Sequence, residues 1–192
     1  MTRTDTKQAG SVAELIKQRR TVRLFKSDAV SAELLTELLN VAVWAPNHGH
    51  REPWRFILFQ GEGRAKLAQA MVQTYSAEDR EKHGNKKMEY FMQVPAHLVI
   101  VMQEDPRQKV WDEDYAAVCS LIQNFQLAAW EQGLGVVWKT NNYGYDPKFR
   151  NAIGMQPGEK IVGVLHVGYP EVIPPARPRT SAEERLTIVE HT

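Results

Sequence analysis

Residues 111–132 read WDEDYAAVCSLIQNFQLAAWEQ, and this stretch decides the expected fold. It is long enough for roughly six helical turns, and its apolar residues fall on nearly every side of a helical wheel. We therefore expect a long helix that is buried all round and forms the centre of the molecule. Gly133 and Gly135 follow directly and are typical of a helix end and a turn.

Shorter elements flank this helix in an order that is not a strict alternation. On the N-terminal side, we expect helices over 12–19, about 31–42 and from about 64, and strands over 54–60 and 97–102. On the C-terminal side, we expect strands over 136–139 and 160–167, a helix over 147–152, and a proline-rich extended tail over 174–179. Four strands mixed with helices in this way favour an α+β fold over a doubly wound parallel sheet.

The segment 75–87 is charged and poor in aliphatic residues. We expect it to form a helix that is interrupted around His83-Gly84-Asn85, because glycine and asparagine favour turns. The wider region 75–90 would then act as a lid or as a contact to a partner chain.

Length and charge restrict the class of protein. At 192 residues the chain is the size of a single domain, spanning 1–192, in which the polar residues 1–10 are expected to be flexible. The formal net charge of +1 gives no reason to expect nucleic acid or a membrane surface as partner. The single Cys119 cannot form an internal disulfide, and no secretory leader is recognisable, so a cytoplasmic location is expected.

A cationic cluster, Arg19-Arg20-Thr21-Val22-Arg23, follows the first expected helix. Guanidinium groups and a hydroxyl so close together suit a phosphate group. Arginines at the C-terminal end of a helix also complement its dipole, and composition alone favours this plain structural role. Both interpretations stay open at this point.

A second polar segment, 45–54, reads APNHGHREPW and is bounded by prolines. The prolines stiffen the loop, and a stiff polar loop is typical of a binding site. His48 and His50 are either turn residues or a pair of imidazoles that could hold a metal ion. We disfavour a metal site, because the other candidate ligands, including His97 and His166, show no ligand spacing.

A third polar segment, Trp138-Lys139-Thr140, lies at the end of the strand expected over 136–139. Strand ends often bind ligands, although a plain loop is an equal alternative from spacing alone. The chain contains no serine-hydrolase, P-loop, zinc-protease or dinucleotide-binding motif. Cys119, in the apolar helix, is expected to be an inert packing residue.

Taken in order, these segments resemble the nitroreductase superfamily, and in particular its short, single-domain NAD(P)H-dependent members. The family's R-R-[ST]-x-R pattern corresponds to residues 19–23, and its A-P-x-x-x-x-x-[QE]-P-W pattern to residues 45–54. The resemblance continues through the long helix, the Gly-Leu-Gly-x-x-Trp segment 133–138 and the strand 161–170. It therefore covers nearly the whole chain.

This resemblance implies a nitroreductase-like α+β fold with a mixed or antiparallel central sheet. It also implies an intertwined homodimer that binds FMN at the subunit interface. The implied activity is a ping-pong cycle in which NADH or NADPH reduces the flavin, and the flavin reduces a small acceptor such as a nitroaromatic or a quinone. No protein residue is then an obligatory acid or base, because the flavin performs the chemistry.

By position, the resemblance assigns the FMN contacts to three segments and the tail. Arg19 and Arg23 would hold the phosphate, and Arg20 and Thr21 would fix the ribityl chain and the ring. The further contacts would come from Asn47, His48, Glu52, Trp138, Lys139 and Thr140, with additional phosphate contacts from Arg177 and Arg179. Many relatives have Gln at the position of Glu52, and an ionised glutamate only accepts hydrogen bonds.

Two other functions stay open from the sequence. The lack of an evident acid or base suggests a flavin-binding or carrier protein without turnover. A metal-dependent hydrolase built on His48 and His50 is the other alternative. The residues identify neither the physiological acceptor nor a preference for NADH or NADPH.

Overall fold

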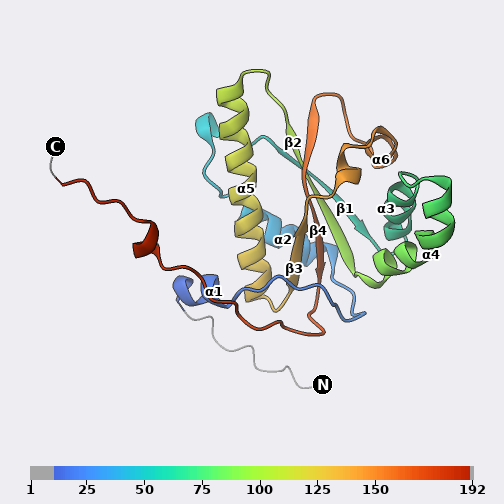
Figure 1. The fold of residues 1–192 in the computed structure, drawn as a ribbon, viewed down its shortest axis with the longest axis horizontal. Helices are drawn as coiled ribbons and strands as arrows, with labels where there is room; N and C mark the ends of the chain where they lie inside the picture. Colours follow the sequence, from blue (N-terminus) through green and yellow to red (C-terminus); the bar gives the residue numbers. More distant parts are fainter. Residues whose placement is uncertain (1–10, 191–192) are drawn as a thin grey trace.

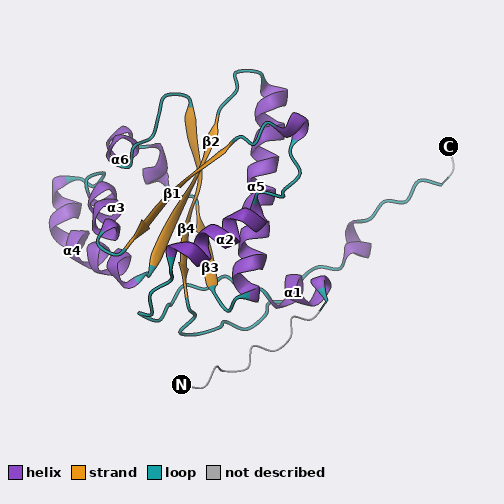
Figure 2. Ribbon diagram, turned by 180° about the vertical axis from the view of Figure 1, so that it is seen from behind, coloured by secondary structure: helices purple, strands orange, loops and turns teal. Residues whose placement is uncertain are grey.

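The structure is a computed structural model in which residues 11–190 are described. Figure 1 shows three layers, with a four-stranded sheet between two groups of helices. Helices α2 (Ala32–Ala42) and α5 (Gln108–Glu131) cover one face, and α3 (Gly63–Val72), α4 (Ala77–Gln93) and α6 (Pro147–Ala152) cover the other. Figure 2 shows the same layers from behind, with helix α1 (Val12–Gln18) beside one end of α5.

The sheet is antiparallel, with the strand order β1-β2-β4-β3. Its strands are β1 (Trp54–Gln60), β2 (Ala96–Gln103), β3 (Gly135–Lys139) and β4 (Glu159–Gly168). The short strand β3 lies at an edge, where Thr21 forms a single bridge with Val136. The expected α+β fold is confirmed, and the sheet is antiparallel rather than mixed.

Both faces of the sheet are buried, which accounts for the nearly continuous apolar sequence of β2. Leu98 and Ile100 belong to the core shared with α2 and α5, whereas Val99 and Val101 belong to the core shared with α3 and α6. All four side chains are fully buried. Each contributes roughly 1.5–3 kcal/mol to the stability of the fold.

The helix starts follow the sequence closely. At α1, Ser11 Oγ accepts a hydrogen bond from the Glu14 N–H at 3.4 Å, and the Ser11 N–H donates to the Glu14 carboxylate at 2.8 Å. Ser31 caps α2 by accepting from the Leu34 N–H at 3.1 Å. Such caps satisfy backbone donors that have no partner within the helix.

The expected interruption around residues 83–85 is wrong, because α4 runs without a break from Ala77 to Gln93. Gly84 is buried where α4 packs on α3. A Cβ on Gly84 would lie 3.4 Å from Val72 Cγ1. This distance is an ordinary van der Waals contact, so the glycine neither ends the helix nor is required by the packing of α4 on α3.

Helix α5 also differs from the expectation, since it begins at Gln108 and is not buried all round within one chain. Its sheet-facing side carries buried residues such as Leu121 and Phe125. Leu127 and Trp130 are only partly buried. Contacts within one chain therefore do not account for all of its apolar residues.

Candidate functional site

The arginine segment, residues 19–23, leaves α1 and runs along the open edge of β3. Val22 is fully buried, and its N–H donates to the β3 backbone at 3.2 Å. A Cβ on Gly135 would lie 2.5 Å from the Val22 side chain, so glycine is required for this close approach. Because side chains alternate along an extended segment, burial of Val22 turns Thr21 and Arg23 outward.

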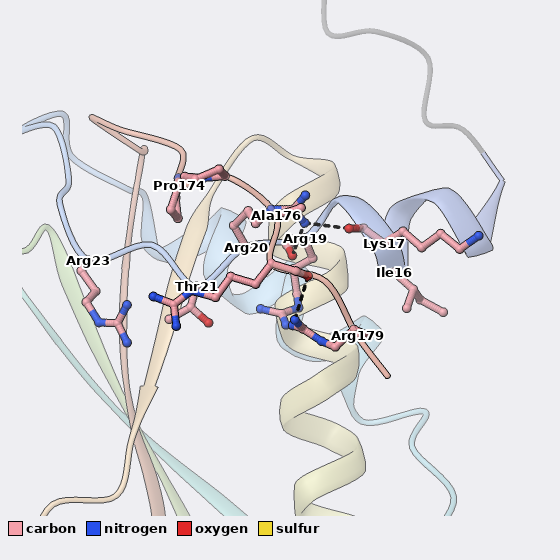
Figure 3. Close-up of a pocket in the computed structure, with 11 residues that line it drawn as sticks. Ile16, Lys17, Arg19, Arg20, Thr21, Arg23, Pro174, Ala176 and Arg179 are labelled. Carbon is pink, nitrogen blue, oxygen red and sulfur yellow. Dashed lines mark hydrogen bonds between the residues drawn. The ribbon is translucent and has the colours of Figure 1, made fainter. Parts of the chain in front are cut away.

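The arginine segment and the C-terminal tail line a cleft of about 610 Å³ (Figure 3). The residues around this arginine cleft are Ile16, Lys17, Arg19, Arg20, Thr21, Arg23, Pro174, Pro175, Ala176, Arg177 and Arg179. Five of them are arginines and none is acidic. In a chain with a formal net charge of only +1, this is a strong local excess of positive charge. The cleft suits an anionic ligand.

Arg19 lacks the partners that a partly buried guanidinium needs. Its Nη1 donates to Gln126 Oε1 at 3.4 Å, but its buried Nε has no hydrogen-bond partner among residues 11–190. Burial, followed by repulsion from Arg20 and Arg179, lowers the pKa of Arg19. No carboxylate within residues 11–190 forms a salt bridge with it. An anion bound here would satisfy the nitrogen and reduce the repulsion.

The other arginines of the cleft have distinct surroundings. Arg20 Nη1 donates to the carbonyls of residues 17–19 at 2.7–3.0 Å, so this side chain has the structural role of closing the end of α1. Figure 3 shows Arg179 beside Arg19, whereas Arg23 lies apart from both. Arg23 instead contributes to lowering the pKa of Lys139. Arg19 and Arg23 therefore lie at two ends of the cleft and do not converge on one point.

The second polar segment closes on itself and on α5. Asn47 Oδ1 accepts from the Glu52 N–H at 3.0 Å. Arg51 forms a bidentate pair with the buried Asp114 of α5, with Nε–Oδ1 and Nη2–Oδ2 distances of 3.0 Å. His50 and Glu52 have positive φ angles of 50° and 45°, a conformation that is uncommon for residues other than glycine. The loop is thus held in a strained conformation next to the N-terminal half of α5.

The first and second polar segments lie far apart in one chain. Arg51 contacts Asp114 and Arg19 contacts Gln126, and twelve residues separate these positions on α5. At 1.5 Å per residue, this corresponds to roughly 18 Å along the helix axis. Figure 1 shows the short 3₁₀ helix His48–His50 near one end of α5 and α1 near the other. Asn47, His48 and Glu52 therefore do not line the arginine cleft of their own chain.

The three residues of the third segment point in different directions. Trp138 Nε1 donates to the Val162 carbonyl at 3.1 Å, and the indole lies over Gly163, where a Cβ would be 2.2 Å from that nitrogen. Lys139 turns to the other face of the sheet, and its Nζ donates to a tyrosine hydroxyl of α4. Thr140 is exposed and lines a second cleft of about 290 Å³.

No group of three or more His, Cys, Asp or Glu side chains suitable for a metal ion occurs among residues 11–190. Over the same residues, no helix is long and apolar enough to cross a membrane.

Gln126 is a residue that sequence reasoning missed. It is buried in the long helix and is the only described side-chain hydrogen-bond partner of Arg19. A glutamine among the apolar residues of such a helix is the signal that could have revealed it, because buried polar groups need partners.

The sheet order, the arginine segment and the proline-bounded loop define a member of the nitroreductase family, and the chain belongs to this family. The family model, described as "Nitroreductase family", matches residues 16–169. The chain is 36% identical over 185 residues to "Putative NAD(P)H nitroreductase YfhC" of Bacillus subtilis. The alignment covers 94% of this chain and 95% of that protein.

Solved structures agree with this assignment. A nitroreductase-like family protein from Bacillus cereus superimposes with a TM-score of 0.92 at 49% identity, over 96% of this chain and 99% of that chain. A nitroreductase with bound FMN from Desulfitobacterium hafniense has a TM-score of 0.70 at 19% identity, over 95% of this chain and 100% of that one. At this lower identity the likeness concerns the fold alone.

Proposed function

We propose that this protein is an FMN-dependent oxidoreductase that uses NADH or NADPH to reduce a small acceptor, such as a nitroaromatic or a quinone, by a ping-pong mechanism. Membership of the nitroreductase family supports the class of reaction. The FMN bound in a relative of the same fold supports the choice of cofactor. When bound, the flavin supplies the hydride and electron chemistry, and the protein supplies position and charge.

The state of Arg19 carries this proposal. A partly buried guanidinium with an unpartnered Nε, next to Arg179 in a cleft whose described lining has no acidic residue, fits a phosphate group. We assign the FMN phosphate to Arg19 and Arg179, with Arg177 nearby and Arg20 acting through the end of α1. Because Arg23 lies at the other end of the cleft, we assign it to the ring end of the cofactor rather than to the phosphate.

The ring end would lie along the edge of β3. Thr21 and Arg23 face outward beside this strand, and Thr140 is exposed at its end. Because β3 is an edge strand of the described sheet, backbone N–H groups at this end could donate to the flavin. Lys139 and Arg23 add positive charge that favours the anionic reduced cofactor. Trp138 supports the strand from the α5 side through its hydrogen bond to Val162.

We further propose a homodimer in which Asn47, His48 and Glu52 reach the cofactor of the partner subunit. The separation of this loop from the arginine cleft of its own chain supports the proposal, since only a second copy could bring the two together. Exposed apolar side chains next to the loop give a surface for such contacts: Trp44 is 87% exposed and Val41 is 55% exposed. Burying such side chains would favour association.

The protein's colour and its reaction with reduced nicotinamide test the activity. The purified protein should carry flavin, or take up added FMN, and the flavin absorbance should bleach when NADH or NADPH is added without oxygen. A quinone should restore it, and steady nicotinamide oxidation would follow. Colourless protein that FMN cannot reconstitute would contradict the proposal, and bound flavin without turnover would favour a carrier. We place this activity in the cytoplasm, in line with the single cysteine of the chain.

A further inference from the structure

A chain of polar side chains lies beneath α4, on the face of the sheet opposite to α5. His97 of β2 and His166 of β4 are direct partners across the two strands. Both are fully buried, with ring centroids 4.5 Å apart and ring planes at 89°. Tyr90 of α4 and Lys139 of β3 continue the chain outward to the edge of the sheet. Tyr90 Oη lies 3.5 Å from His166 Nδ1 and 2.6 Å from Lys139 Nζ.

The Phe91 carbonyl, at the inner end of this row of side chains, determines the tautomer of His97. Its Nε2 lies 2.9 Å from the Phe91 carbonyl oxygen, which can only accept a hydrogen bond. Nε2 must therefore carry the proton. Burial lowers the pKa of His97 to about 4, so the ring is neutral at pH 7 and Nδ1 presents a lone pair.

Lys139 and Tyr90, at the outer end of the row, determine the tautomer of His166. The Lys139 ammonium has only donors, so the Tyr90 oxygen accepts at the 2.6 Å contact. The Tyr90 O–H is then free to donate to His166 Nδ1 across the longer 3.5 Å contact. Burial holds the pKa of His166 well below its usual value, so this ring is neutral as well and its proton lies on Nε2.

These assignments give the roles of two buried nitrogens that have no hydrogen-bond partner. The two nitrogens are His97 Nδ1 and His166 Nε2. The first is a lone-pair acceptor and the second is an N–H donor, and they belong to rings in contact across neighbouring strands. No hydrogen bond joins the two rings, which meet only through their edge-to-face contact. The donors therefore run from Lys139 through Tyr90 to His166, and separately from His97 to the Phe91 carbonyl.

The charges around Lys139 are all positive. Lys87 of α4 and Arg23 of the arginine segment both lower its pKa by repulsion, after the larger effect of burial, to about 8. Its Nζ lies 4.6 Å from the centroid of the Tyr90 ring, and Arg64 acts on the inner end at His97. No carboxylate among the described residues forms a salt bridge with Lys139. The Tyr90 ring and hydroxyl are therefore what stabilises the ammonium.

We propose that Tyr90 and His166 are positioning residues whose hydrogen bonds run in one direction from Lys139 and hold it as an oriented ammonium at the end of β3, with the His97 ring packed against His166. The Tyr90 proton is committed to His166, so Tyr90 can serve Lys139 only as an acceptor. The chain thereby favours the charged lysine against burial and repulsion. The significance of this charge for the reaction rests on the proposed flavin site, which places the cofactor ring beside this strand end.

Nitrogen NMR of the wild-type protein, without cofactor, tests these hydrogen bonds. In protein labelled with ¹⁵N-histidine, long-range ¹H–¹⁵N spectra at pH 7 should show both His97 and His166 as neutral rings protonated at Nε2. Assignment uses His97→Gln and His166→Gln. A proton on Nδ1 of His166 would overturn the proposal.

Competitive acylation, which detects only the neutral amine, measures the ionisation of Lys139. Peptide mass spectrometry should show that Tyr90→Phe lowers the pH midpoint of acylation at Lys139 by about one pH unit. The shift is expected because a hydrogen bond to the charged lysine is lost. Lys87→Met should raise the midpoint, because a repelling charge is removed. Tyr145→Phe, an exposed tyrosine outside the chain, is the matched control and should leave it unchanged. An unchanged or raised midpoint in Tyr90→Phe, with the thermal melt retained, would overturn the proposal.

The FMN-loaded protein gives a further readout. The pH profile of FMN reduction by NADPH should decline at high pH, and Tyr90→Phe should move this decline to lower pH by the same amount as the acylation midpoint. If the profile does not move although the acylation midpoint does, the charge has no role in the reaction and the proposal fails in that respect. Protein that binds no FMN but shows the expected tautomers and acylation midpoints would contradict the proposed function. The proposed role of Tyr90 and His166 toward Lys139 would still hold.

Discussion

Individual residues in this protein are held in ionisation states that differ from those of the free side chains. Burial keeps His97 and His166 neutral, and burial with positive neighbours weakens the charge of Lys139. Arg19 carries a buried donor that has no partner. The histidines and Lys139 lie beneath α4, whereas Arg19 contacts Gln126 of α5 on the other face of the sheet.

The buried histidines should make the fold sensitive to mild acid. The pKa of His97 is about 4 in the folded chain, against about 6.5 when unfolded. Its contribution is therefore complete above pH 6.5 and is lost as the pH falls towards 4. For this residue alone, the free energy of unfolding should be about 2 kcal/mol lower at pH 5 than at pH 8. His166, whose pKa is also lowered, adds to the effect.

Urea unfolding between pH 4.5 and pH 8 measures this dependence. His97→Gln retains a donor that could serve the Phe91 carbonyl but cannot titrate, so its stability should vary less with pH in this window. His48→Gln, at an exposed histidine of the second polar segment, is the matched control and should follow the wild-type curve. Equal slopes for His97→Gln and the wild type would show that burial of His97 does not carry the acid sensitivity.

At the scale of single elements, the arginine segment depends on the edge strand β3. Val22 fills the space that Gly135 leaves open, and the backbone bond from Val22 joins the segment to the strand. This packing sets where Thr21 and Arg23 point. A change at Gly135, which touches no ligand in our account, should therefore disturb the site.

Gly135→Ala should lower both stability and affinity for FMN. The new Cβ would lie 2.5 Å from the Val22 side chain, and such overpacking costs typically 1–3 kcal/mol. Gly63→Ala is the matched control, because no heavy atom lies within 4 Å of the added Cβ there. Urea unfolding and FMN fluorescence titration measure the two effects. Equal behaviour of the two alanine variants would contradict the packing argument.

Most elements could be predicted from the sequence because their signals are local. The capping box at Ser11 and the apolar run of β1 depend on neighbouring residues alone, and the predicted limits of β1 agree with the structure. The prediction failed at Gly84, which lies within α4 where this helix packs on α3. Packing between elements depends on residues that are distant in the sequence, so local patterns do not predict it.

The candidate site was predictable only in its parts. The arginine segment lines a cleft, and its role as a phosphate site stays a prediction. The pairing of His97 with His166 was missed, because only the register of β2 and β4 brings these distant residues together. The position of the second polar segment was equally hidden, since it depends on the contact between Arg51 and Asp114.

At the scale of the whole molecule, one chain holds the parts of the proposed site at separate places along α5. The arginine cleft lies at one end of this helix and the proline-bounded loop at the other (Figure 1). Partly exposed apolar residues of α5, together with Trp44, leave apolar surface without a partner in the chain. A second copy would explain both observations.

Trp44→Glu should therefore weaken the dimer and the retention of FMN together. A buried, unpaired carboxylate at an interface is unfavourable. Light scattering after size-exclusion chromatography should give a mass near twice 21.9 kDa for the wild type and a shift towards 21.9 kDa for the variant. Lys66→Glu, on the exposed side of α3, is the control and should leave the mass unchanged. A monomeric variant that retains FMN fully would contradict the shared site.

The central claim is that Arg19 holds the phosphate of FMN, and a comparison with riboflavin tests it most directly because riboflavin lacks only that phosphate. Fluorescence titration should show that the wild-type protein binds FMN roughly 100-fold more tightly than riboflavin, given about 1.5–3 kcal/mol for each hydrogen bond to a charged group. In Arg19→Ala this preference should fall to about tenfold or less, with riboflavin affinity nearly unchanged. An undiminished preference for FMN in Arg19→Ala would contradict the account.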